Sequence, residues 1–230
     1  MFYNESRTIS DCKEIPSTIF DLIKENHLEM VDKILTKNIV DINTKDEVGY
    51  DVLSRLLAKG AYDLVEKHMK NKQWNINNQN IEGNTFAHIL VSINYVKVKQ
   101  IILNLKKNKS FDINIKNYKG ETILDKSINS NYIYTTIKIL EDTRFNNIDI
   151  VSFKHLFEVY IKNNSYGKYS KISNLEIILD NLEDKNLIPS MNKVVINIKD
   201  NIKTIKTEIL NNNIKTVNDI INNIYKEINE

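Results

Sequence analysis

The hydrophobic positions of this chain recur at helical spacing in short segments that come in pairs. After Ser17, which can cap a helix, the first segment continues to Asn26, where the apolar pattern breaks. The apolar residues of the first two segments are Ile19, Phe20, Leu22 and Ile23, then Leu28, Val31, Ile34 and Leu35. Spacings of three and four residues predict two amphipathic helices. Because helices this short cannot bury an apolar face alone, the pattern predicts that each pair packs against another.

A polar frame separates the pairs and repeats along the chain. It consists of Ile-Asn, a polar turn, Gly, one residue, a cap residue and an apolar helix start. The frame glycines Gly49, Gly83 and Gly120 stand 34 residues apart (49 to 83) and 37 apart (83 to 120), a period typical of stacked helical repeats. The residues at the cap position, two after each glycine, are Asp51, Thr85 and Thr122.

The turns between the two helices of each pair keep the same register. From each frame glycine to the residue that ends the first helix is 11 positions, and the same count joins Ile15 to Asn26 in the first pair. The residues at this turn are Asn26, Gly60, Asn94 and Asn131. Gly and Asn tolerate the left-handed backbone that often ends a helix, so the register predicts four helix-turn-helix units.

This register resembles the ankyrin-repeat family, whose hallmark is Gly-x-Thr-Pro-Leu-His, with an Asn before the next turn. Gly83–His88 keeps the Gly, Thr and His, Gly120–Asp125 keeps the Gly, Thr and Leu, and Gly49–Leu53 keeps the Gly and Leu. The residues at the family's Asn position are Asn43, Asn77 and Asn114. The residues in place of its Pro are Val52, Phe86 and Ile123, which removes some preorganisation of the helix start.

The resemblance covers about Pro16–Ile150 and implies an all-α fold, an ankyrin-repeat solenoid of about four helix-turn-helix units. It implies a structural part for six residues: Gly49, Gly83, Thr85, His88, Gly120 and Thr122. At the family's His position, the imidazole of His88 is expected to hydrogen-bond between neighbouring units. With its bias toward Asn, Ile and Lys, the chain looks most like the ankyrin proteins of giant DNA viruses of the mimivirus kind.

The patterns divide the chain into four parts. Residues 1–14 are polar without a period, which favours a flexible lead, and residues 15–150 form the predicted solenoid. Residues 151–188, where Ser152 can cap a helix but no frame glycine follows, are expected to form a degenerate repeat or cap. Residues 189–230 carry apolar residues in steps of three and four, which predicts an amphipathic helical hairpin. Three alternatives are open for this segment. The hairpin folds onto the end of the solenoid, it forms a coiled coil for oligomerisation or partner binding, or it is disordered.

Composition and charge narrow the class of protein. Apolar residues make up 41% of the 230 residues, enough for a core, and the net charge of +2 gives no support for nucleic-acid or membrane binding. Cys12 is the only cysteine, which excludes an intramolecular disulfide and disfavours a cysteine-based zinc site. The first residues lack an apolar signal region, and no run approaches about 18 apolar residues. We therefore expect a soluble intracellular protein, in the host cytoplasm or the virion if it is viral.

No motif for catalysis or cofactor binding is present in the sequence. The four histidines lie in different segments without metal-ligand spacing: His27, His68, His88 and His155. A serine nucleophile elbow is absent, and the five glycines are too widely spaced for a phosphate-binding loop. We therefore predict no enzymatic activity, no cofactor and no metal. The lysines from Lys97 to Lys109 form either a nucleic-acid patch or a solvated helix face, and the balanced charge favours the solvated face.

The polar turns are the predicted binding surface. Their tips, Lys45–Val48, Gln79–Glu82 and Lys116–Lys119, should project in a row, one from each unit. The predicted partner-binding residues are Val48, Tyr50, Asn80, Ile81, Glu82, Asn117, Tyr118 and Lys119. A structural turn needs no apolar or aromatic side chains, whereas interfaces favour them as anchors. The sequence therefore predicts a module that binds a host or viral protein through the tips and the concave face.

Two other hypotheses remain open. In the first, the hairpin 189–230 recruits a second protein, as in viral ankyrin proteins with a ubiquitin-ligase-binding tail, or mediates oligomerisation. No F-box-like sequence occurs in this segment. In the second, the Lys97–Lys109 face binds nucleic acid, which a steep dependence of affinity on salt would reveal.

Overall fold

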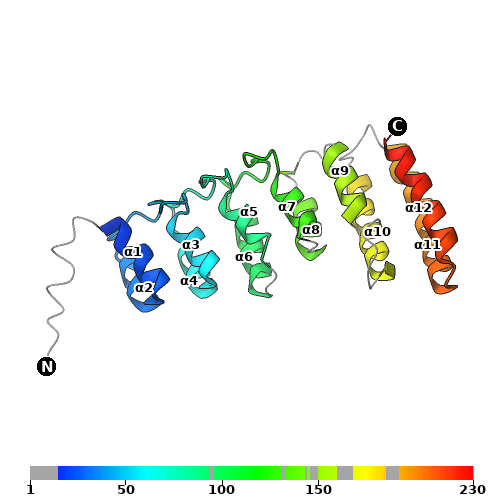
Figure 1. Cartoon of the computed structure of the whole chain (residues 1–230). Helices are drawn as coiled ribbons and strands as arrows, with labels where there is room; N and C mark the ends of the chain where they lie inside the picture. Colours follow the sequence, from blue (N-terminus) through cyan, green and yellow to red (C-terminus); the bar gives the residue numbers. More distant parts are fainter. Residues whose placement is uncertain are drawn as a thin grey trace, which may run out of the picture. The chain divides into compact units, whose positions relative to one another are not determined.

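The computed structural model describes residues 15–93, 96–130, 133–142, 144–145, 150–159, 168–184 and 192–229, so the predicted lead 1–14 lies outside the described residues. These residues form twelve helices and two isolated β-bridges (Figure 1), which confirms the predicted all-α class. Contacts divide the chain into two compact units. The first takes in the described residues up to Phe111 together with Lys116–Gly120, and the second takes in Asp112–Ile115 and those from Glu121 onward.

The described part of the first unit holds three helical pairs in two layers. Its helices are α1 (Ile15–Lys24), α2 (Leu28–Thr36), α3 (Val52–Lys59), α4 (Tyr62–His68), α5 (Phe86–Leu90) and α6 (Val96–Lys107). The first helices α1, α3 and α5 contact one another in that order, and the second helices α2, α4 and α6 do the same. This stacking of like helix on like helix is the one that the repeat register predicts.

Apolar side chains fill the space between the two layers. Fully buried members of this core are Ile19, Ile23, Val31, Leu53, Leu56, Leu57, Val65, Leu90 and Ile101. Leu53 and Ala87 are buried at equivalent places of successive repeats, and Leu124 is buried at the corresponding place in the second unit. The assigned register is therefore confirmed at these positions.

Caps and left-handed residues fix the helix ends. The cap Asp51 accepts the Ser54 N–H at 2.8 Å, and Thr85 and Thr122 close capping boxes at α5 and at α7 (Ile123–Asn129). The turns that end α1 and α3 are left-handed at Asn26 (φ 67°) and Gly60 (φ 84°), as expected. The predicted turn residues Asn94 and Asn131 lie outside the described residues.

Two predicted caps are wrong. Ser17 lies inside α1, which begins at Ile15, because Pro16 is tolerated in the first turn of a helix and does not delay its start. Ser152 likewise lies inside α9 (Ile150–Phe157), which begins two residues earlier. Both errors place a helix start too late, since a serine near an apolar run is a weaker signal than the frame glycine that marks the other starts.

The second unit is also built from paired helices in its described residues. Beside α7 and α9 they are α8 (Ile133–Leu140), α10 (Lys168–Asp184), α11 (Asn192–Leu210) and α12 (Ile214–Asn229). Helix α9 packs on α7, and α10 packs on α8, in the way that one repeat packs on the next. Helices α9 and α10 lie in the part of the chain for which a degenerate repeat or cap is predicted. The contacts divide the chain between α6 and α7, whereas the sequence places its boundary near residue 150.

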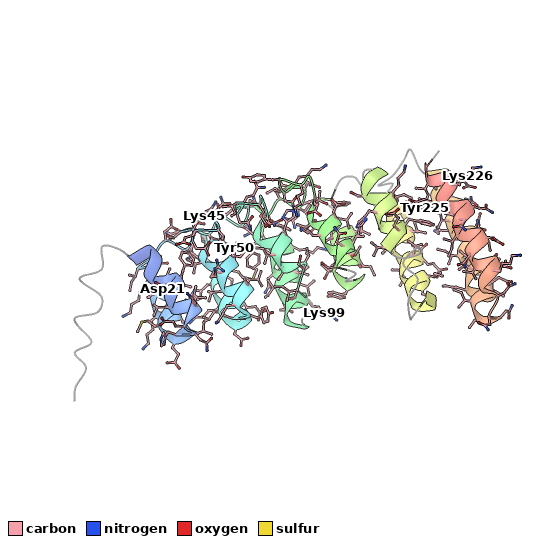
Figure 2. All side chains as sticks on the ribbon, in the orientation of Figure 1. Asp21, Lys45, Tyr50, Lys99, Tyr225 and Lys226 are labelled. Carbon is pink, nitrogen blue, oxygen red and sulfur yellow. The ribbon has the colours of Figure 1, made fainter. Side chains whose placement is uncertain are left out.

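Helices α11 and α12 form a hairpin, joined by a turn in which Asn212 is left-handed (φ 57°). The apolar positions buried in it are Val195, Ile198, Ile202, Ile205, Val217, Ile221, Ile224 and Ile228. Lys199 of α11 pairs with Asp180 of α10 at 2.7 Å. Tyr225 of α12 is labelled in Figure 2. Its hydroxyl donates to Glu158 at 2.6 Å, and its ring stacks on Phe157 with 6.5 Å between the ring centroids. The hairpin therefore packs on α9 and α10.

Candidate protein-binding surface

In each turn tip, a side-chain oxygen accepts hydrogen bonds from backbone N–H groups of the same turn. Asp46 Oδ1 accepts the backbone N–H of Val48 at 3.1 Å and that of Tyr50 at 2.9 Å. Bonds of the same kind recur in the next two tips, from Glu82 and Asn84 to Asn80 Oδ1 (3.0 and 2.8 Å) and from Lys119 to Asn117 Oδ1 (3.0 Å). Asp and Asn suit these positions because their short side chains reach the backbone two residues further on.

The frame glycines meet two demands at these tips. Gly49, Gly83 and Gly120 have φ of 79°, 76° and 79°, the left-handed conformation that the frame predicts and that glycine adopts without strain. Gly83 also lies against the following turn, since a Cβ there would stand 2.6 Å from the backbone nitrogen and from Cδ1 of Tyr118. Gly49 lies in the same way against Ile81, whose nitrogen would be 2.8 Å from an added Cβ.

Neighbouring tips are hydrogen-bonded to one another. The Ile81 N–H donates to the Val48 carbonyl at 3.3 Å, and the Tyr118 N–H donates to the Glu82 carbonyl at 3.0 Å. Asn residues at the family's Asn position add bonds to the loop that follows each second helix: Asn43 to Gln73 (2.7 Å), Asn77 to Ser110 (2.7 Å) and Asn114 to Arg144 (3.0 Å). The main chain of the three tips is therefore fixed from turn to turn.

Three large apolar side chains project from these tips. Val48, Ile81 and Tyr118, called here the tip row, are 40%, 63% and 74% exposed. All three belong to the first unit. Exposed apolar groups that lie on consecutive, mutually bonded turns form a surface with a fixed shape, and such surfaces often mark contacts with another protein.

The other predicted partner-binding residues differ in their exposure. Asn80 and Asn117 are buried, because their side chains bond the tip backbone, so their prediction as contact residues is corrected. Tyr50 is half-buried with the Arg55 guanidinium 4.8 Å above its ring. Glu82 and Lys119 are exposed beside the tip row. An Asp or Asn three residues before each frame glycine is the sequence signal that identifies the turn-building residues.

His88 has a structural position in α5. Its Nδ1 accepts the Thr85 N–H at 3.2 Å and lies 2.8 Å from the Thr85 hydroxyl, which closes the capping box. These bonds lie within its own repeat, and the predicted bond to a neighbouring repeat stays a prediction. In α7, Asp125 occupies the position that His88 has in α5, and its carboxylate accepts the Thr122 N–H. The capping box is therefore closed by an imidazole in one repeat and by a carboxylate in the next.

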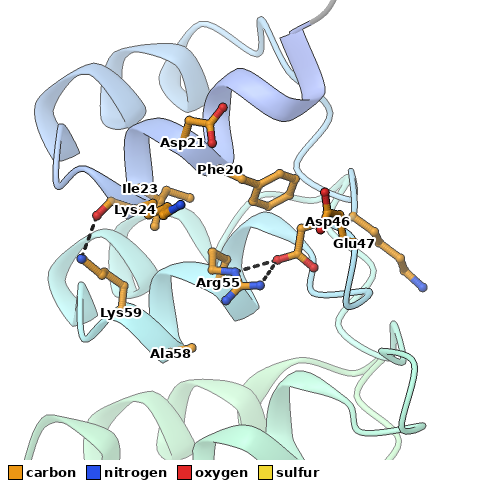
Figure 3. Close-up of a pocket in the computed structure, with 10 residues that line it drawn as sticks. Phe20, Asp21, Ile23, Lys24, Asp46, Glu47, Arg55, Ala58 and Lys59 are labelled. Atoms are coloured by element: carbon orange, nitrogen blue, oxygen red, sulfur yellow. Dashed lines mark hydrogen bonds and ion pairs between the residues drawn. The ribbon is translucent and has the colours of Figure 1, made fainter.

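A pocket of about 590 Å³ adjoins the first tip (Figure 3). It is formed by α1, α3 and the first turn, and its charged and aromatic residues include Phe20, Asp21, Lys24, Glu47, Arg55 and Lys59. Arg55 Nε donates to Asp46 at 2.6 Å, and Lys59 donates to the Lys24 carbonyl at 3.0 Å. The pocket extends the candidate surface from the tips onto the layer of first helices, with both signs of charge.

The lysines of the Lys97–Lys109 segment do not gather in one place. Lys99 lies at the far end of its helical pair from Lys45 and Tyr50 (Figure 2) and is exposed. Lys107 and Lys109 are exposed at the other end of α6, and the side chain of Lys97 lies outside the described residues. The segment is therefore spread along the whole length of the helix.

Within the described ranges, no three His, Cys, Asp or Glu side chains gather as they would to hold a metal ion. His68 bonds Asp32 at 2.7 Å, and His27 lies 3.4 Å from Glu25. None of the described helices combines the length and the apolar character needed to cross a membrane.

Comparisons with known proteins agree with the fold. No protein-family profile matches the chain. The chain is similar to the crystal structure of the ankyrin repeat domain of Bcl-3, a unique member of the IkappaB protein family, with a TM-score of 0.57 and 15% identity over 71% of this chain and 70% of that one. The chain thus has the ankyrin-repeat fold.

A curated relative matches a smaller part. Over 59 residues, which are 26% of this chain, the sequence is 37% identical to acyl-CoA-binding domain-containing protein 6 of Danio rerio. The match spans 20% of that relative's length.

Proposed function

We propose that this chain is a non-enzymatic binding module that engages a protein partner through the tip row and the adjoining first-helix face. The ankyrin-repeat fold is in general a scaffold for protein–protein interaction. The observation that carries the proposal is the exposure of Val48, Ile81 and Tyr118 on turns whose backbones are bonded to one another. Such turns lose little conformational freedom on binding, which favours affinity.

The chemistry of the tips fits a protein surface with an apolar centre and a polar rim. Tyr118 carries an apolar ring and a polar hydroxyl, the combination enriched at interface hot spots. Glu82 and Lys119, both exposed, flank it with opposite charges. The resemblance to ankyrin proteins of giant DNA viruses leads us to propose a host or viral protein as the partner, in an intracellular setting.

A triple variant tests this proposal. Val48→Ser, Ile81→Ser and Tyr118→Ser together should lower capture of the partner from a lysate of the expressing cells at least about tenfold, because single anchors contribute about 2 kcal/mol or more. The readout is quantitative mass spectrometry of proteins retained by the immobilised chain. Helical circular dichroism and melting temperature should stay nearly unchanged, since these side chains lie outside the core.

The matched control removes three exposed apolar side chains elsewhere. Met30→Ser, Ile177→Ser and Ile196→Ser replace residues that are 51%, 44% and 49% exposed. This control should retain full capture. Equal loss in both variants, or full capture by the tip variant, would contradict recognition through the tip row.

Recruitment of a second protein by the hairpin is the alternative function. The apolar seam of α11 and α12 is buried within the hairpin, so it offers no apolar stripe for a coiled coil with another chain. The exposed residues of α12 are polar, among those whose side chains the structure describes: Lys215, Asp219, Asn222, Asn223, Lys226 and Glu227. A polar outer face is typical of the terminal cap of a repeat array. We therefore place the adaptor and oligomerisation hypotheses second.

A further inference from the structure

A second groove lies in the first unit, away from the residues of the tip row. It has a volume of about 390 Å³ and lies between the segment 69–76, which follows α4, and the end of α6. Its polar lining consists of Lys70, Asn71, Lys72, Asn104, Lys107 and Asn108, with Ser110. We propose that this groove binds an acidic segment of a protein partner, at a site separate from the tip row.

The charge of the groove has a single sign. Lys70, Lys72 and Lys107 line it and are exposed, and no acidic residue is among the lining residues. None of the three ammonium groups has a hydrogen-bond or ion-pair partner among the described residues. Three unpaired cations around one groove create a local positive potential, although the chain as a whole carries a net charge of only +2.

Three hydrogen-bond acceptors at this groove are already engaged within the chain. Asn71 Oδ1 accepts the Gln73 N–H at 2.9 Å, and Asn108 Oδ1 accepts the Ser110 N–H at 2.9 Å. The Ser110 carbonyl accepts the Asn77 amide at 2.7 Å. Ammonium groups supply donors and no acceptors, so the groove suits a ligand rich in acceptors, such as a row of carboxylates.

The floor of the groove is part of the buried core. Met69, Trp74 and Ile76 line it and are buried. The Trp74 indole donates to Asp51 Oδ2 at 2.9 Å, and its ring meets Phe86 edge to face at 5.0 Å. A floor fixed on both sides by the core holds the segments that carry the three lysines at a constant separation, which favours one extended ligand over a diffuse ion cloud.

A peptide fits this groove better than a nucleic acid does. Binding of single-stranded nucleic acid relies on exposed aromatic rings on which bases stack. The aromatic residue of this groove is Trp74, which is only 5% exposed and packed on Phe86. The volume lies near the lower end of the range of about 300–1,000 Å³ for ligand sites, which suits a few side chains of a peptide.

The position of Trp74 supplies a direct test in the full-length chain. It is the only tryptophan of the protein and lines the groove, so its fluorescence reports on occupancy. Titration with a hexapeptide of alternating Asp and Glu should give a saturable change, and the corresponding Asn and Gln peptide should give none. The triple variant Lys70→Gln, Lys72→Gln and Lys107→Gln should weaken binding roughly tenfold or more, because three ion pairs are lost together.

A matched variant distinguishes the effect of the groove lysines on binding from the effect of the net charge of the chain. Lys33→Gln, Lys37→Gln and Lys203→Gln remove three exposed lysines outside the groove, so both variants lose the same charge. The control should bind the acidic peptide as the wild type does. Equal weakening in both variants, no saturable change in the wild type, or equal binding of the neutral peptide would overturn the proposal. Tighter binding of a short oligothymidine, lost with Lys70, Lys72 and Lys107, would also overturn it in favour of a nucleic-acid site.

Discussion

At the scale of single residues, the turn tips depend on glycine for two separable reasons. Gly83 and Gly120 have nearly the same φ, 76° and 79°. An added Cβ at Gly83 would meet Tyr118 at 2.6 Å, whereas one at Gly120 would meet none of the described residues within 4 Å. The first reason is therefore backbone conformation, which both share, and the second is close approach of the next tip, which Gly83 has in common with Gly49.

Alanine substitution should separate these two reasons. Gly120→Ala should destabilise the first unit by about 1–2 kcal/mol, the strain of a left-handed residue with a Cβ. Gly83→Ala should cost about 1–3 kcal/mol more, because the backbone of Tyr118 must move. Urea unfolding followed by Trp74 fluorescence measures both, since Trp74 belongs to this unit. Equal destabilisation by the two substitutions would contradict the close approach at Gly83.

The sequence predicted the glycines better than the tip side chains. Periodic spacing identifies Gly49, Gly83 and Gly120 because a left-handed turn leaves few other choices. Asn80 and Asn117 were predicted as contact residues because amides in a turn resemble surface groups, although burial and backbone bonds assign them to the turn. Exposure of an amide depends on the neighbouring turn that covers it, which local sequence does not specify.

At the scale of helices, Asp32 joins α2 to α4. It accepts hydrogen bonds from Lys67 and His68, 2.7 Å to Oδ1 in each case. The Lys67 bond, followed by that of His68, lowers the pKa of Asp32 below its ordinary value of 3.8. The folded state therefore favours the carboxylate. The stability that Asp32 contributes is fully present above 3.8 and is lost as the pH falls through the lower pKa of the folded state.

Substitution of Asp32 should show this dependence. Asp32→Asn should destabilise the first unit at pH 6 by about 1 kcal/mol or less, because the pair is partly exposed and screened by solvent. The difference from wild type should shrink as the pH is lowered below 3.8. Urea unfolding by Trp74 fluorescence at several pH values provides the measurement. Glu29→Gln, which removes an exposed carboxylate on the same helix, is the control. A difference in stability between Asp32→Asn and wild type that grew as the pH fell would contradict the lowered pKa of Asp32.

Burial in α7 gives a second prediction at this scale. Leu124 is 1% exposed in the second unit, whereas Leu210 at the end of α11 is 73% exposed. Leu124→Ala should destabilise that unit by about 2–5 kcal/mol, since it removes buried methyl groups and leaves a cavity. Leu210→Ala should change stability by no more than about 0.5 kcal/mol. Thermal unfolding followed by far-ultraviolet circular dichroism compares them, and an unmoved transition for Leu124→Ala would contradict the register.

At the scale of the whole molecule, helix periodicity predicted paired helices and a hairpin, whereas the two compact units follow from contacts between residues distant in sequence. Apolar steps of three and four residues located the hairpin of α11 and α12, because every seam residue faces the same side. What that seam packs against depends on contacts of α11 with α10 and of Tyr225 with α9, between residues distant in sequence. The same holds for the groove beside Trp74, whose lysines come from two repeats.

A variant of the exposed face of α12 tests whether the hairpin or the tip row recognises the partner. Lys215→Ala, Asp219→Ala, Asn222→Ala and Asn223→Ala together alter the exposed face of α12 and leave its buried seam intact. We expect this variant to capture the same partner as the wild type, because a terminal cap contributes solubility and stability to the array. The tip variant at Val48, Ile81 and Tyr118 should lose that partner in the same assay. The reverse result, with capture lost in the α12 variant and kept in the tip variant, would assign recognition to the hairpin and leave the repeats as its support.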